Sequence, residues 1–206
     1  MKNLILVFLI IPFSAFAKFY NGNVNFNDGT SKKGFIEIPD YPDDSKLKFR
    51  SEERGKTEKF QIDLVKGFEI INEKNEVIKY LTILLAEPKI FTKDKYRLGT
   101  KKSWVRIIKE GKIDIYQTYS VYNPSSKSGG EGSVYIHKKD EIYAYAFATF
   151  TGGFNFVVNG YSSAKNYIHA IFKDDCPNLS EIITKEALKE KGYSVIVDLY
   201  EENCGK

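Results

Sequence analysis

The sequence is poor in the residues that usually mark a metal site or a disulfide-dense scaffold. Its 206 residues include only two histidines, His137 and His169, and two cysteines, Cys176 and Cys204. A zinc site needs three or four convergent ligands, and neither histidine has a ligand-spaced partner beside it in the sequence. We therefore expect no metal and no cofactor, and we interpret both histidines as structural or surface residues.

Arginine is also scarce, and apolar runs are short beyond the start of the chain. The chain has 31 Lys and Arg against 27 Asp and Glu, and the basic residues, mostly Lys, are scattered among the acids. Nucleic-acid-binding proteins concentrate positive charge on one face, so no nucleic-acid partner is expected. A bilayer span takes roughly 20 apolar residues, and we expect none in the mature chain. A hydrophobic content of 42% is enough for a folded core.

The first 17 residues have the pattern of a secretory signal peptide. Lys2 supplies a positive charge, an apolar run follows from Leu4 to Phe13, and the segment ends in Ser14-Ala15-Phe16-Ala17. The small residues of this ending suit cleavage after Ala17. The alternative, a membrane anchor, needs a longer run. We expect a mature chain of residues 18–206 that is exported to the periplasm, the cell envelope or the medium.

Export changes the interpretation of the two cysteines. An even number of cysteines in an exported protein argues for a disulfide between Cys176 and Cys204. The segment Val195–Asn203 is ambiguous, because its β-branched start favours a strand. A helix here, after another over 179–191, would return Cys204 to the vicinity of Cys176, whereas a strand would travel too far. We prefer a helix.

Residues 18–87 are typical of a meander of short strands. Apolar and polar residues alternate from Phe19 to Phe26, Asn27-Asp28-Gly29-Thr30 is a turn signal, and further strands follow at intervals of about ten residues. This pattern predicts a small N-terminal barrel or sandwich. Glu87-Pro88 interrupts the pattern and is the predicted boundary to a second part, residues 88–206.

The second part predicts an antiparallel sheet followed by helices. Strands are expected over 103–109, 112–122, 133–138 and 141–149. Ser162 or Ser163 can cap a helix that runs to about Phe172, and Asn178, with a glutamate three residues later, can cap another that stops at Gly192. The expected fold class is α+β: two β-rich parts and then two or three short C-terminal helices.

The cysteine-containing tail carries a resemblance to known sequences. The stretch Phe172–Leu179, a helical segment and the ending Leu199–Cys204 resemble the tail of uncharacterised exported β-rich proteins of Bacteroidetes, and the first hairpin with its Asn-Asp-Gly-Thr turn resembles their start. Tyr200 is followed by Glu201, where those proteins have Asn. The resemblance implies an exported β-rich protein and brings no known activity.

One short motif points to catalysis. Ser162 and Lys165 form a Ser-x-x-Lys tetrad at a predicted helix start, the spacing with which penicillin-binding enzymes place an amine beside a nucleophilic hydroxyl. The companion motifs of those enzymes are absent from the sequence. Helix caps also select serine, so we interpret the tetrad as a cap.

Fourteen tyrosines are the feature that favours binding. If the two hairpins of the second part pair, one face could present several amphipathic rings to a protein or a carbohydrate. The alternative is cross-strand pairing that stabilises the sheet. The tyrosines concerned are Tyr116, Tyr122, Tyr135, Tyr143 and Tyr145, with Tyr119 nearby.

These observations predict an exported, non-catalytic protein that binds a partner, protein or carbohydrate, at the cell envelope. The alternative is an envelope hydrolase that uses Ser162 and Lys165.

Overall fold

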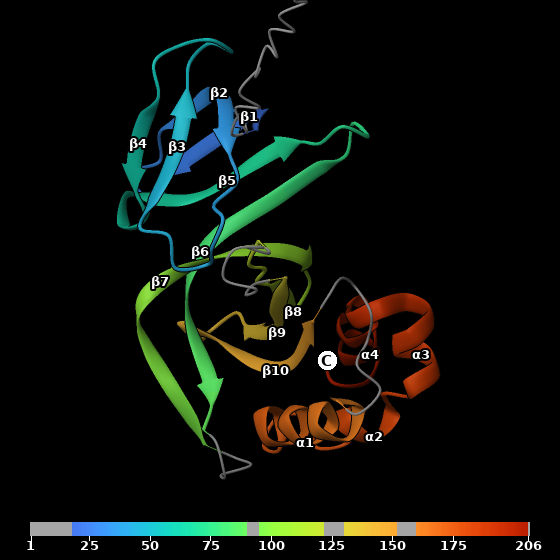
Figure 1. Cartoon of the computed structure of the whole chain (residues 1–206). Helices are drawn as coiled ribbons and strands as arrows, with labels where there is room; N and C mark the ends of the chain where they lie inside the picture. The colour runs from blue at the N-terminus through green and yellow to red at the C-terminus, as the bar shows by residue number, and fades with distance from the viewer. Residues whose placement is uncertain (1–17, 90–94, 122–129, 152–159, 206) are drawn as a thin grey trace, which may run out of the picture.

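A computed structural model describes residues 18–89, 95–121, 130–151 and 160–205 and confirms the expected α+β class. Figure 1 shows two β-rich parts, one above the other, and a group of helices beside the lower part. Ten strands belong to one sheet, in the order β10-β9-β8-β7-β6-β5-β1-β2-β3-β4. The strands are β1 (Phe19–Phe26), β2 (Ser31–Glu37), β3 (Lys46–Arg50), β4 (Glu58–Gln61), β5 (Val65–Ile71), β6 (Val77–Pro88), β7 (Tyr96–Lys109), β8 (Ile113–Gln117), β9 (Glu131–Lys138) and β10 (Tyr143–Thr151).

Strands β1 to β5 curl around one core, as their alternating pattern predicts. The β1–β2 turn is the expected one, because Gly29 has a φ of +86° and Asp28 Oδ1 accepts from the Thr30 amide at 2.9 Å. Trp104 of β7 completes this core, and its indole Nε1 donates to the carbonyl of Asp44 at 2.8 Å. The fully buried apolar residues of the core include Val24, Ile36, Leu47, Phe49, Val65, Phe68 and Ile70.

Strands β6 to β10 close into a five-stranded barrel, which the sequence did not predict. Each strand is antiparallel to the next, and β10 returns to pair with β6 in parallel, with Tyr143 opposite Leu84 and Tyr145 opposite Ala86. The parallel pairing follows from strand number. In an antiparallel meander of five strands the first and the last run in the same direction, so the ring can close only in parallel.

The two faces of the barrel wall have different neighbours. Large rings and small residues fill the interior, as the taper of a small barrel requires: Leu85, Val105, Tyr116, Tyr135, Ala144 and Ala146. The outer faces of β8, β9 and β10 pack against the helices, with Ile115, Ile136 and Phe147 buried there. All five residues of β8 are therefore buried, and the strand is shorter than the one expected over 112–122.

The described residues form four helices beside the barrel: α1 (Tyr161–Phe172), α2 (Leu179–Ile182), α3 (Lys185–Lys191) and α4 (Val195–Asn203). The expected helix over 179–191 is broken, because Ile183 is extended and its carbonyl accepts from the Tyr161 hydroxyl at 2.7 Å. The predicted serine cap is wrong, because Ser162 and Ser163 lie inside α1 and Gly160 is at its N-cap. Asn178 is at the N-cap of α2, as predicted, but its side chain makes no capping hydrogen bond. Thr184 caps α3 instead, and its hydroxyl accepts from the Ala187 amide.

The predicted helix over Val195–Asn203 and the disulfide are both confirmed. Cys176 and Cys204 are bridged, with Cα atoms 5.7 Å apart and a sequence separation of 28. The bridge joins the end of α4 to the segment between α1 and α2. Among the described residues, no helix is both long and apolar enough to cross a membrane.

Glu87 and Pro88 are the last two residues of β6, where the sequence suggested a boundary. Both residues pair with β7. Strand β6 pairs with β5 of the first β-rich part and with β10 of the barrel. Strands β6 and β7 therefore run through both β-rich parts. The division of the chain at this point into two structural units stays a prediction.

Candidate functional site

A cavity lies among the described residues where β6 and β7 separate. Their ladder begins at Tyr80 and Arg106. Before this point β6 stays with β5, where Val77 pairs with Ile71. Beyond Arg106, β7 stays with β8, where Lys109 pairs with Ile115. Among the described residues, neither strand has a partner on the side that faces the other, so the two diverging ends leave an opening between them.

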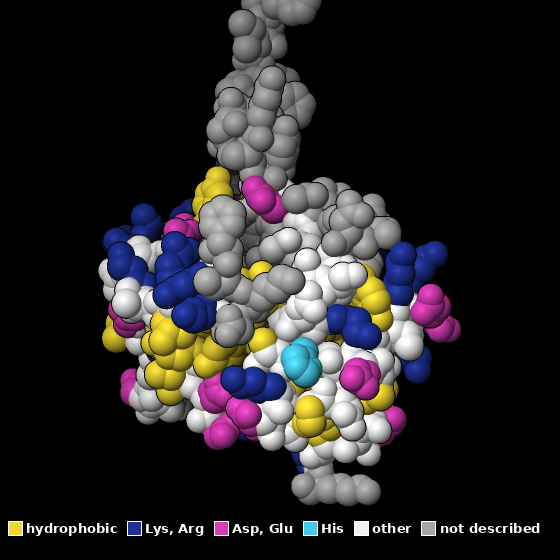
Figure 2. All heavy atoms as spheres, turned by 90° about the horizontal axis from the view of Figure 1, so that it is seen from below, with side chains coloured by type: hydrophobic (Ala, Val, Ile, Leu, Met, Phe, Trp, Pro, Cys, Tyr) yellow, Lys and Arg dark blue, Asp and Glu magenta, His cyan; other side chains and the backbone are white. Residues whose placement is uncertain are grey.

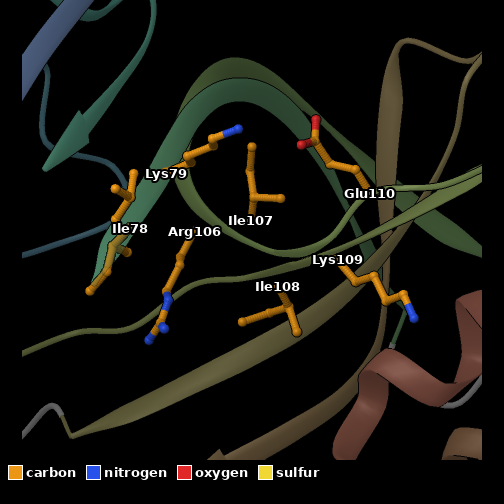
Figure 3. Close-up of a pocket in the computed structure, with 8 residues that line it drawn as sticks. Ile78, Lys79, Arg106, Ile107, Ile108, Lys109 and Glu110 are labelled. Atoms are coloured by element: carbon orange, nitrogen blue, oxygen red, sulfur yellow. The ribbon is translucent and has the colours of Figure 1, made fainter. Parts of the chain in front are cut away.

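This opening is a groove with a volume of about 290 Å³, at the small end of the range for ligand sites. Figure 3 shows the labelled side chains around it, with Lys79 and Glu110 on the upper side of this view and Arg106 and Ile108 on the lower. We call it the β6–β7 groove. Its apolar residues are Val77, Ile78, Ile107 and Ile108, and its charged residues are Lys79, Arg106, Lys109 and Glu110.

Three of the four apolar residues of the groove pack against three different cores, whereas Val77 is exposed. Ile78 packs against the core of β1 to β5, Ile107 against the barrel interior, and Ile108 against the core between barrel and helices. The walls are therefore fixed from three sides, which favours a preformed site.

Three of the four charged residues of the groove are cations. Lys109 is occupied in an ion pair with Asp198 of α4. Arg106 lies close enough to Tyr80 that its charge lowers the pKa of that hydroxyl, although burial, the larger effect, raises it. Lys79 and Arg106 form no ion pair within the described part of the chain. The groove can therefore offer two separate cations to the negatively charged groups of a ligand.

A second polar cluster is buried at one end of the barrel. Asp114 of β8 lies directly opposite His137 of β9, and its side chain is 3% exposed. Asp114 Oδ2 accepts from the Tyr116 hydroxyl at 2.7 Å and from Lys139 Nζ at 2.8 Å, and it lies 3.4 Å from His137 Nδ1. Burial raises the pKa of the Asp114 carboxyl, but the hydrogen bonds from His137, Lys139 and Tyr116 lower it to about 2.

The contacts of His137 favour the charged imidazolium. Its Nε2 lies 2.8 Å from the carbonyl oxygen of Glu141, and its Nδ1 faces the Asp114 carboxylate and the Tyr116 hydroxyl oxygen. Both ring nitrogens thus face acceptors, and both carry hydrogen only in the cation. Burial lowers the pKa of His137, but the contacts with Asp114 and the Glu141 carbonyl raise it. Since both ring nitrogens of His137 are engaged, this histidine is not available as a general base. The cluster instead links β8 to β9.

The tyrosines predicted to form a binding face are distributed over several environments. Tyr116 and Tyr135 are buried in the barrel, and Tyr135 donates to Glu87 Oε1 at 2.6 Å. Tyr143 and Tyr145 are half-buried, and the Tyr145 ring packs edge-on against Tyr96 at 5.1 Å between centroids. Tyr119 is exposed, and Tyr122 lies outside the described residues. The structure therefore does not bring these rings together on one exposed face.

The Ser-x-x-Lys tetrad lies on α1, and neither Ser162 nor Lys165 lines the β6–β7 groove. Ser162 is exposed, and the ammonium of Lys165 lies 5.7 Å from the ring centroid of Tyr161. No hydrogen bond joins Ser162 to Lys165 among the contacts of the described residues. His169 is also exposed on α1, 32 residues after His137 in sequence. Within the described ranges, no group of three His, Cys, Asp or Glu side chains is placed to hold a metal.

Sequence reasoning missed both the groove and the Asp114 cluster. The groove depends on where the pairing of β6 with β7 ends, and the alternation of apolar and polar residues in the sequence does not show this. The cluster had a visible signal: Asp114 stands between Ile113 and Ile115, and an acid within a buried strand needs hydrogen-bond donors nearby.

The face of the molecule seen in Figure 2 carries charges of both signs, because Lys and Arg lie among Asp and Glu and between apolar side chains.

No protein family, curated protein or solved structure matches the chain.

Proposed function

We propose that the chain is an exported, non-catalytic protein that binds a partner at the cell envelope, and that the β6–β7 groove is its binding site. The β6–β7 groove carries this proposal, because it combines apolar and charged lining residues, two cations without an ion pair in the described part of the chain, and strand ends with a free side.

Two features support export. The leader has the pattern of a cleavable signal, and the bridge between Cys176 and Cys204 needs an oxidising compartment to persist. The resemblance to exported β-rich proteins of Bacteroidetes agrees with this interpretation.

The construction of the β6–β7 groove supports binding. Residues from three cores form its walls, so a ligand would meet a surface that is already ordered and would cost little reorganisation. The other polar cluster is saturated internally, and its histidine is engaged at both nitrogens.

Site-specific photo-crosslinking tests this proposal with a matched pair of positions. Val77 lines the β6–β7 groove and is 59% exposed, while Leu64 lies outside it and is 58% exposed. A photoreactive side chain is placed at either position, and cells that export the chain are irradiated. We expect a discrete adduct from position 77 and none from position 64. Equal labelling at the two positions, or no adduct at 77, would remove the groove as the binding site.

A further inference from the structure

The free edge of β6 is regular enough to accept another strand. Its register with β5 is unbroken from Gly67–Leu81 to Ile71–Val77. The facing end of β7 is less regular, since its register with β8 shifts between Ile107 and Lys109. The three residues of β6 before the ladder with β7, Val77 to Lys79, span about 10 Å as a strand, so an added segment of three or four residues matches them.

The two available cations lie on opposite faces of the sheet. Tyr80 and Arg106 are directly opposite each other and share one face. Lys79 precedes Tyr80 in β6, and consecutive residues of a strand point to opposite faces. A ligand strand with two consecutive acidic residues would therefore direct one carboxylate towards Lys79 and the other towards Arg106. Arginine is well suited to this, because its guanidinium can bind a carboxylate through two parallel hydrogen bonds.

Two exposed apolar side chains lie at the β6–β7 groove, Val77 in its lining and Ile71 beside it on β5. Ile71 and Val77 are a cross-strand pair, 43% and 59% exposed. Apolar side chains that flank the acidic pair of a ligand would cover this exposed surface.

On these grounds we propose that the ligand is an extended segment of a partner protein, with two consecutive acidic residues between apolar ones, which adds to the free edge of β6. The inference rests on the proposed function and names the partner's chemistry. Backbone hydrogen bonds to β6 would supply affinity, and Lys79 and Arg106 would select the acids.

The alternative is that these cations only protect an open edge. Lysine beside an unpaired strand discourages self-association, and no ligand is then required. This alternative predicts that no peptide binds, whatever its charge.

The probe is an eight-residue peptide, acetyl-Ser-Thr-Val-Glu-Glu-Val-Thr-Ser-amide, titrated into the oxidised chain of residues 18–206 and followed by amide chemical shifts. We expect saturable shifts at Val77–Lys79. Peptides with Gln-Gln or Lys-Lys in place of Glu-Glu should bind at least about tenfold more weakly, the contribution of one charge-assisted hydrogen bond. A Glu-Glu peptide with N-methylated central amides should lose binding, because it cannot pair with a strand edge.

Two variants connect the binding to the cations. Lys79→Gln and Arg106→Gln should each weaken binding of the Glu-Glu peptide about tenfold. Lys59→Gln on β4 is the control, because Lys59 is an exposed strand lysine outside the β6–β7 groove, and it should bind like the unmodified chain. Thermal midpoints of all variants show whether the fold is intact. If Arg106→Gln does not fold, Lys79→Gln decides alone.

The results separate the two proposals. Equal binding of Glu-Glu and Lys-Lys peptides, or retained binding of the N-methylated one, overturns the proposed ligand. No peptide binding together with a persistent adduct at position 77 also overturns it, while the groove remains a binding site. Loss of both signals overturns both proposals.

Discussion

At the scale of single residues, the Asp114 cluster shows how the barrel accommodates charge in its interior. The Asp114 carboxylate receives hydrogen bonds from a tyrosine, a lysine and the Gly111 amide, and His137 lies beside it. Each donor offsets part of the cost of removing a carboxylate from water. The cluster thus fixes β8 against β9 at one end of the barrel.

The raised pKa of His137 makes stability depend on pH. The folded state holds this proton more tightly than the unfolded state, whose histidine has an ordinary value of about 6.5. The contribution is therefore complete below about pH 6.5 and is lost as pH rises through the folded pKa. We expect the free energy of unfolding, measured in urea, to fall from pH 6 towards pH 8.

The second histidine provides the control for this measurement. His137→Gln should flatten the decrease between pH 6 and pH 8, while His169→Gln should leave it unchanged, because His169 is exposed on α1. Other titratable groups also face His137, namely Asp114, Tyr116 and Lys139. The pKa of Asp114 is lowered to about 2 and that of Tyr116 is raised above its usual value of 10, so neither of these two groups changes charge between pH 6 and pH 8. An undiminished slope in His137→Gln would show that the cluster is not its source.

The chemistry of single residues was only partly predictable from the sequence. The turn at Asp28-Gly29 was predicted correctly because its signal is local. The partners of Asp114 come from another strand, and strand register decides which residues meet. Tyr116 and Tyr135 were placed on a potential binding face because alternation identifies two faces and does not show that both are covered.

At the scale of elements, contacts with the β7–β8 hairpin hold the helical tail to the barrel, and the disulfide joins the end of α4 to the segment between α1 and α2 within that tail. Lys109 forms an ion pair with Asp198 of α4, and the Lys112 amide donates to Glu201 Oε1 at 2.9 Å. Cys204 follows the end of α4, where the chain would otherwise be free to fray. The bridge therefore stabilises the last helices at their outer end.

Loss of the disulfide should lower stability measurably. For a loop of 28 residues the chain-entropy model gives about 3–4 kcal/mol, which corresponds to a fall of roughly 10 °C in the thermal midpoint for a chain of this size. Calorimetry of the Cys176→Ala, Cys204→Ala double variant checks this. A reductant should destabilise the unmodified chain to the same level and leave the double variant unaffected. Equal midpoints for the oxidised and reduced chains would contradict the prediction.

The positions of the helices were predicted better than their number, because two or three were expected and the described residues form four. The helix at Val195–Asn203 followed from the distance that the two cysteines must cover. The break at Ile183 could not be predicted, because the apolar side chain of this residue continues the helical pattern. The carbonyl of Ile183 accepts a hydrogen bond from the Tyr161 hydroxyl, and this contact between distant residues is not visible in the sequence.

At the scale of the whole molecule, β6 and β7 connect the three cores. Adjacent residues of β7 belong to different cores, since Trp104 packs into the core of β1 to β5 and Val105 into the barrel interior. The expectation of strands in two β-rich parts followed from periodicity. Closure of the second part was not predictable, because it depends on a contact between β10 and β6, which lie far apart in sequence.

This shared arrangement predicts that the two β-rich parts unfold together. The chain has one tryptophan, and Trp104 reports on the core of β1 to β5. We expect its fluorescence and the far-ultraviolet circular dichroism of the whole chain to follow one transition in urea. A fluorescence midpoint separated from the dichroism midpoint would instead favour two independent units divided near Pro88.

The bond between Cys176 and Cys204 also determines what happens to a damaged molecule. It turns α2, α3 and α4 into a covalent ring. If an extracellular protease hydrolysed a single peptide bond within that ring, for example between Thr184 and Lys185, no fragment would diffuse away. The severed ends would stay at high effective concentration, and the nick would become visible as two pieces only after reduction.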